Sequence, residues 1–292
     1  MPLAGCKYSI TLSSFKDIGE KIDKTIERLT RQGYDGLEMI GEPENVNMKS
    51  LQDVFRSFNM PVCGITGMWG SSSTNGADRK LLSSLPHVIK SSEVYVRRCV
   101  EMCQLLGAQV LNICLFADDE VFSFDRTHSI LTKDQKSRLI DRVIPLLRKL
   151  TAFAKNHGVE LLLEPLNRYS TPFCTTASDA IDLANKINQD NFGILLDTFH
   201  MNIEEDSFDY AIQKSKTLLH HMHFADNNRK MPGYAHIDFG SIMSNLARIG
   251  YTEYISFEPS LTLDNYRWIT KNGLNFIKNI EQATRGTRAH NC

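Results

Sequence analysis

Four residues in the second half of the chain could together hold a divalent metal ion. Glu164, Asp197, His223 and Glu258 each stand at the carboxyl end of a short apolar run, a pattern typical of buried parallel strands. A charged side chain at such a place needs a partner, because an unpaired buried charge is costly. Three carboxylates and one imidazole suit a hard-to-borderline divalent cation. The residue types therefore predict a metal enzyme.

Two of these candidate ligands are followed directly by proline. Pro165 follows Glu164 and Pro259 follows Glu258. Since proline cannot donate to a sheet ladder, each strand should end there and leave its carboxylate at the rim. The repeated Glu-Pro pair predicts a shared role, in which the two glutamates act as an acid/base pair on opposite faces of a substrate. The structural alternative for Glu164 is an ion pair with Arg168.

The sixth and seventh apolar runs carry further polar candidates. Asp197 and His200 are three residues apart, so a turn after the strand could direct both to one place. The alternatives are a helix-capping role for Asp197 and a surface position for His200. Alternation along a strand places His221 and His223 on one face, with His223 nearer the rim and His221 deeper in the interior. Arg229, in the polar loop that follows, could hold a substrate oxygen.

The elements that must position these residues alternate along the whole chain. Apolar runs predict strands at Tyr8–Ile10, Gly36–Met39, Val62–Thr66, Val110–Leu115, Glu160–Leu163, Gly193–Leu196, Leu219–His223 and Tyr254–Phe257. Periodic stretches predict helices at Ile18–Gln32, Met48–Asn59, Ser92–Leu106, Asp134–Asn156, Ala177–Asn188, Phe208–Ser215, Phe239–Ile249 and Asn265–Glu281. Eight such units predict an α/β fold of the closed (β/α)8 TIM-barrel class, with residues 1–292 forming a single domain.

Two long connections should emerge on the same rim as the candidate ligands. They span Trp69–Leu85 and Ala117–Lys133, and loops of that length in compact domains are often functional. We predict that Trp69 contacts the substrate. No Gly-x-Gly-x-x-Gly turn follows the first strand, which weighs against a dinucleotide-binding fold.

Composition narrows the class of partner. With 33 Lys and Arg against 34 Asp and Glu, the net charge is -1, so no overall basic field attracts nucleic acid or an anionic membrane. No apolar run approaches the ~20 residues that would cross a bilayer. The first ten residues lack the apolar stretch of a signal peptide, and we expect a cytoplasmic location. The seven cysteines contain no Cys-x-x-Cys pair and are expected to be reduced.

The motifs around the candidate ligands resemble those of a known superfamily. The segments are Glu164-Pro-Leu-Asn-Arg-Tyr, Leu196-Asp-Thr-Phe-His-Met-Asn, and His223 followed by Arg229 and Pro232-Gly233. They resemble the sugar phosphate isomerase/epimerase superfamily of xylose-isomerase-like TIM barrels, and within it the ketose 3-epimerases (the D-tagatose and D-psicose 3-epimerase group).

The resemblance implies one divalent ion, first of all Mn2+ with Mg2+, Co2+ or Zn2+ as alternatives, on Glu164, Asp197, His223 and Glu258. It also implies that the two glutamates epimerise a ketose at C3 through an enediolate whose charge the cation neutralises. Residues that match His200 and Arg229 contact the substrate near its reacting carbonyl. Members of the group are dimers or tetramers, so the resemblance implies a homo-oligomer.

One departure keeps other functions open. Ketose 3-epimerases usually carry a glutamate where this chain has Ser170. The metal chemistry is unaffected, but an inosose dehydratase, a hydroxypyruvate-type isomerase or a keto-glycoside lyase would begin with the same proton abstraction. The endonuclease IV type of nuclease is a remote alternative. It also carries Asp-Thr-x-His, but it needs histidines on the third and fourth strands, which have none here.

Overall fold

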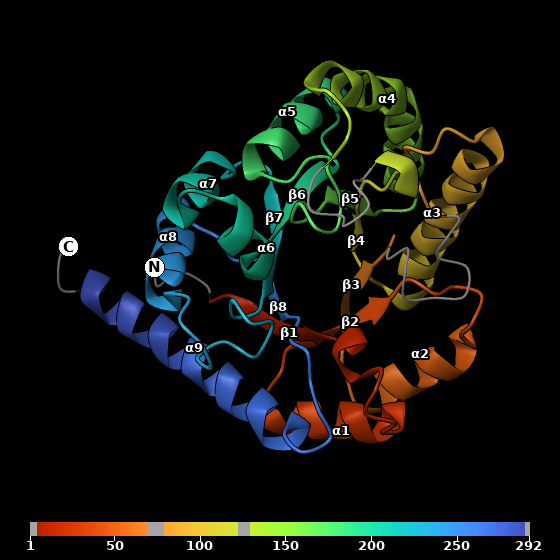
Figure 1. The fold of residues 1–292 in the computed structure, drawn as a ribbon. Coiled ribbons are helices and arrows are strands. Elements are labelled where there is room, and N and C mark those ends of the chain that lie inside the picture. Colours follow the sequence, from red (N-terminus) through yellow and green to blue (C-terminus); the bar gives the residue numbers. More distant parts are fainter. Residues whose placement is uncertain (1–4, 69–78, 122–128, 290–292) are drawn as a thin grey trace.

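Eight parallel strands close into a barrel in chain order, and the first strand pairs with the last to complete it (Figure 1). The computed structural model describes residues 5–68, 79–121 and 129–289. The strands are β1 (Lys7–Thr11), β2 (Gly36–Ile40), β3 (Val62–Thr66), β4 (Val110–Ile113), β5 (Glu160–Leu163), β6 (Phe192–Asp197), β7 (Leu219–Phe224) and β8 (Tyr254–Phe257). The predicted (β/α)8 class is confirmed.

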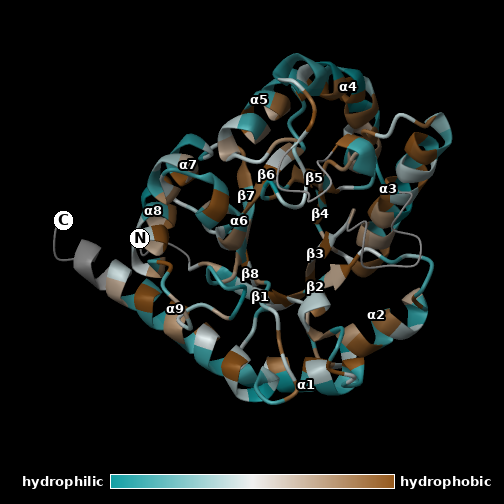
Figure 2. Cartoon of the chain, viewed as in Figure 1, coloured by the Kyte–Doolittle hydropathy of each residue, from teal (hydrophilic) through white to brown (hydrophobic). Residues whose placement is uncertain are grey.

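The helices form a ring around the barrel (Figure 1). They are α1 (Ile22–Gln32), α2 (Met48–Ser57), α3 (Pro86–Leu106), α4 (Lys133–Asn156), α5 (Ala177–Ile187), α6 (Thr198–Glu204), α7 (Phe208–Lys214), α8 (Phe239–Ile249) and α9 (Tyr266–Ala289). Brown and teal residues mix along each helix in Figure 2. This is the amphipathic pattern of helices that pack one face on a core.

Local sequence explains where several of these helices begin and end. Gly33, Gly107 and Gly250 follow α1, α3 and α8 with φ of 88°, 75° and 77°, the left-handed conformation that ends a helix. At the other end of α4, Thr132 and Gln135 form a reciprocal capping box. These helix ends hold the connections at fixed points on the barrel.

The structure differs from the predicted elements at a few places. A helix that was not predicted, α6, follows β6 directly, and a short 3-10 helix spans Leu12–Phe15. The third helix begins at Pro86 rather than Ser92, because proline is well accommodated in the first turn of a helix. The last helix runs to Ala289 rather than Glu281.

Two further findings concern the sequence-based expectations. Within the described ranges, no helix is long and apolar enough to cross a membrane. The six cysteines in this part of the chain are all free. Trp69, the predicted substrate contact, lies outside the described residues.

Candidate metal centre

The ends of four strands bring the predicted ligands together. One ligand atom each of Glu164, Asp197, His223 and Glu258 lies within 4.8 Å of the others, and all four residues are buried. Asp197 and His223 are register partners on β6 and β7, whereas Glu164 and Glu258 follow the last residues of β5 and β8. Residues from four strands thus converge on one point at the carboxyl-terminal mouth of the barrel.

The free atoms of this cluster fit a divalent cation. Nδ1 of His223 lies 3.1 Å from a Glu258 oxygen and 3.6 Å from Oε1 of Glu164. Among the described residues, neither that nitrogen nor Oε1 of Glu164 has a hydrogen-bond partner. Buried polar atoms rarely lack partners, so such atoms directed at one point fit a site that binds a ligand. A set of three carboxylates and one imidazole is suited to a divalent ion.

Arg229 lies against two of the candidate ligands. Its guanidinium donates to Oδ2 of Asp197 at 2.5 Å and also to Glu258. Burial would raise the pKa of Asp197, but Arg229, together with His200 and His223, holds that pKa below its usual value. For Glu258 the opposite holds, because burial raises the pKa despite the neighbouring Arg229 and His223. The site thus carries a fixed positive charge at its edge.

The loop that carries Arg229 is organised by one carboxylate. Asp226 accepts hydrogen bonds from the backbone N–H groups of residues 227, 233, 235 and 237, at 2.9–3.1 Å. Arg229 itself has a positive φ of 59°, which turns the chain back so that its carbonyl accepts from Ser260 N. The guanidinium is therefore presented by a loop whose shape is fixed by hydrogen bonds to a buried carboxylate.

His200 is buried rather than at the surface. Its Nδ1 accepts the backbone N–H of Asn167 at 3.2 Å, and the Asn167 side-chain nitrogen lies 2.8 Å away. A backbone N–H can only donate, so the ring proton must reside on Nε2. Nε2 has no partner within the described part of the chain. Burial lowers the pKa of His200, which makes it an uncharged donor for a substrate oxygen.

Two buried residues that were not predicted from the sequence contact members of the cluster from within the barrel. Asn112 on β4 donates its amide to Oε2 of Glu164 at 2.6 Å, which leaves Oε1 directed to the ligand cluster. Glu38 on β2 lies 2.9 Å from Nε2 of His223. Both are polar residues inside otherwise apolar strand runs, which is the sequence signal that could have found them.

The structural alternatives for the predicted residues are resolved by their contacts. Arg168 pairs with Glu204 and not with Glu164. Asp197 does cap α6, since its Oδ1 accepts from Phe199 N at 2.7 Å, but its Oδ2 remains on the cluster side with Arg229. The two readings of Asp197 are therefore compatible.

The comparison with known proteins gives the chain a family. A family model described as "Xylose isomerase-like TIM barrel" matches residues 26–280. The chain belongs to this family. Its relatives include a D-psicose 3-epimerase of Ruminiclostridium cellulolyticum, 29% identical over 80% of this chain and 76% of that protein. A 3-dehydro-D-guloside 4-epimerase of Escherichia coli is 24% identical over 84% of this chain and 90% of that protein.

Solved structures of two sugar epimerases share the fold of this chain. An L-ribulose 3-epimerase superposes with a TM-score of 0.81 at 22% identity, covering 97% of each chain. The E. coli 3-keto-D-glucoside 4-epimerase superposes with a TM-score of 0.80 at 21% identity, covering 94% of this chain and 99% of the other. The shared architecture extends over nearly the full length of both barrels.

Proposed function

We propose that the protein is a divalent-metal-dependent sugar epimerase that interconverts ketoses at C3. The observation that carries this proposal is the convergence of Glu164, Asp197, His223 and Glu258 on one buried point at the barrel mouth. Relatives named as epimerases of D-psicose and L-ribulose support the reaction class.

The four clustered residues would hold the ion, with Mn2+ as the proposed metal. When bound, such an ion supplies Lewis acidity that polarises a carbonyl and acidifies the neighbouring C–H. All other steps fall to the protein. Arg229 and the Nε2–H of His200 are donors that can bind substrate oxygens and fix the orientation of the sugar.

The proton transfers are assigned to the two glutamates. They stand on β5 and β8, so they approach a bound sugar from different sides of the mouth. One carboxylate removes the proton at C3, and the other returns a proton from the opposite face, which inverts that carbon. The Asn112 amide keeps Oε2 of Glu164 in place during this exchange.

The test is solvent-deuterium incorporation at C3, followed by NMR with the Mn2+-loaded protein in D2O. The Glu258→Gln variant should lose roughly 10²–10⁴-fold of the exchange rate, the usual contribution of a general acid or base. Glu160→Gln is the matched control, because Glu160 is on the same barrel but pairs with His220 outside the site. Exchange at the wild-type rate in Glu258→Gln would show that this assignment is wrong.

A second candidate is the same proton abstraction from a keto-glycoside. This second candidate is favoured by Ser170, which stands where ketose 3-epimerases usually have a glutamate. The Ser170 hydroxyl contacts Oδ1 of Asn167 at 3.4 Å. The related 3-dehydro-D-guloside 4-epimerase has a substrate of this kind. Incubating 3-keto-glycosides beside free ketoses in the same assay decides between the two, since only the true substrate acquires deuterium.

A further inference from the structure

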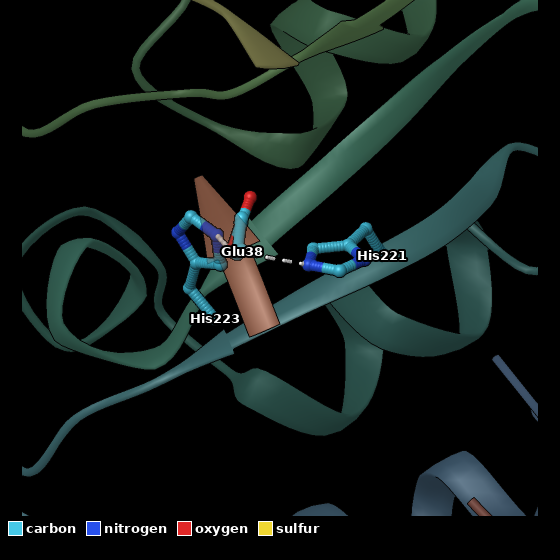
Figure 3. Close-up of side chains that lie close together, drawn as sticks. All are labelled: Glu38, His221 and His223. Atoms are coloured by element: carbon cyan, nitrogen blue, oxygen red, sulfur yellow. Dashed lines mark hydrogen bonds and ion pairs between the residues drawn. The ribbon is translucent and has the colours of Figure 1, made fainter. Parts of the chain in front are cut away.

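A buried carboxylate lies on the far side of His223 from the candidate metal centre. Oε2 of Glu38 is 2.9 Å from Nε2 of His223, and both side chains are fully buried. Figure 3 shows Glu38, on β2, between the rings of His221 and His223 on β7. The other ring nitrogen of His223, Nδ1, faces Glu164 and Glu258. The imidazole therefore stands between a carboxylate and the ligand cluster.

The geometry of this contact favours donation from the ring to the carboxylate. Oε2 of Glu38 is the closest approach of both imidazoles, at 2.9 Å from Nε2 of His223 and 3.5 Å from Nε2 of His221. A carboxylate accepts hydrogen bonds, so Nε2 of His223 is the donor in this contact. The ring is left with Nδ1 as the nitrogen whose lone pair is available to a cation.

We propose that Glu38 is a positioning residue that fixes the tautomer and orientation of His223 as a metal ligand. The inference rests on the proposed metal site and adds to it a residue that touches neither metal nor substrate. A carboxylate behind a ligating histidine increases the basicity of the ring and restricts its rotation. Of the described residues, Glu38 alone has an atom at hydrogen-bond distance from Nε2 of His223.

The same three residues also have the chemical types of a second metal site. For His223 the geometry is that of a hydrogen bond, whereas Nε2 of His221 approaches the same oxygen and has no hydrogen-bond partner among the described residues. That oxygen is 2.9 Å from His223 and 3.5 Å from Nε2 of His221. Metal stoichiometry distinguishes the two arrangements directly.

The experiment measures Mn2+ binding to the full chain by electron paramagnetic resonance of the free ion. The variants are Glu38→Leu, which removes the acceptor, and Glu38→Gln, whose amide oxygen can still accept from Nε2 without the charge. Glu160→Gln is the matched control, because Glu160 on β5 forms a similar carboxylate–imidazole contact. It lies 2.6 Å from His220, which is on β7 like His223. Urea unfolding of the metal-free proteins reports any purely structural loss.

We expect the wild type to bind one Mn2+, and Glu38→Leu to bind it roughly 10–100-fold more weakly. Glu38→Gln should fall between the two, and Glu160→Gln should bind like the wild type. Nitrogen-15 spectra of the Mg2+-loaded wild type should show the His223 ring proton on Nε2. The loss of affinity should exceed what any change in metal-free unfolding explains.

Three results would overturn the inference. Wild-type affinity in both Glu38 variants would exclude a positioning role, and so would a His223 ring protonated on Nδ1. Two Mn2+ ions in the wild type, with one lost in Glu38→Leu, would make Glu38 a ligand. A wild type that binds no Mn2+ would instead refute the proposed metal site itself, so the two failures are distinguishable.

Discussion

The buried amide of Asn112 offers a stringent test of how the proposed base is held. Its side-chain nitrogen donates to Oε2 of Glu164 at 2.6 Å in a fully enclosed environment. Asn112→Leu keeps the approximate size of the side chain and removes this donor. A hydrogen bond to a charged group contributes about 1.5–3 kcal/mol, and its loss leaves Oε2 with the weak contact of the Cys114 thiol at 3.8 Å. Since about 1.4 kcal/mol corresponds to tenfold, proton exchange should slow roughly 10–150-fold.

The assay for Asn112→Leu is deuterium incorporation by the Mn2+-loaded protein, with urea unfolding of the same preparation. The matched control is Asn191→Leu. Asn191 is also a buried asparagine, but its amide donates to the carbonyls of Thr151 and Val159, away from the site. We expect both variants to lose about 1–3 kcal/mol of unfolding free energy and only Asn112→Leu to lose exchange. Wild-type exchange in Asn112→Leu, or an equal loss in both variants, would refute the reasoning.

Three further predictions concern stability. The hydrogen bond to Glu160 raises the pKa of His220, so the pair stabilises the folded state below the unfolded pKa of about 6.5 and loses this effect as pH rises through the raised value. Glu160→Gln should therefore lower Tm more at pH 6 than at pH 9, and a loss independent of pH would contradict this. Arg79 donates twice to Glu42 at 2.7 Å. Arg79→Met should lower the free energy of unfolding in urea by about 3 kcal/mol, because the Glu42 carboxylate loses its charged partner. An unchanged urea midpoint would count against this prediction. Chelation should lower the stability of Mn2+-loaded protein by ~2.7 kcal/mol when free Mn2+ had been 100 times Kd, and a Tm indifferent to chelator would argue against a bound ion.

The strands of the barrel were predictable because each is a local apolar run. Val62–Thr66, Glu160–Leu163 and Tyr254–Phe257 have the predicted bounds, and the other strands differ by one or two residues at their ends. The short helix α6 was not predicted, because seven residues carry too little periodicity to signal a helix. It depends on Asp197 as its N-cap and on contacts such as that of the Thr198 hydroxyl with the Ala225 carbonyl.

The four clustered residues at the strand ends were predictable from the sequence, but the residues that contact them from within the barrel were not. A charged residue at a strand end is visible in sequence, and this identified the four clustered residues. Glu38 lies within its strand, 185 residues from His223 in the sequence. Only the closure of the barrel and the register of its strands bring the two together. Such a contact has no local sequence signal beyond a polar residue in an apolar run.

The loop around Asp226 has a consequence for how this protein can change over time. Four backbone N–H groups converge on that carboxylate, and backbone groups are the same whatever side chains the loop carries. The conformation of the loop therefore depends little on the identity of most of its side chains. An exposed position such as Lys230 can be exchanged while Arg229 keeps its place, whereas Asn228 is constrained because its Oδ1 accepts from Lys230 N. Selection, or a laboratory library, can thus vary the exposed side chains of this loop without rebuilding the site.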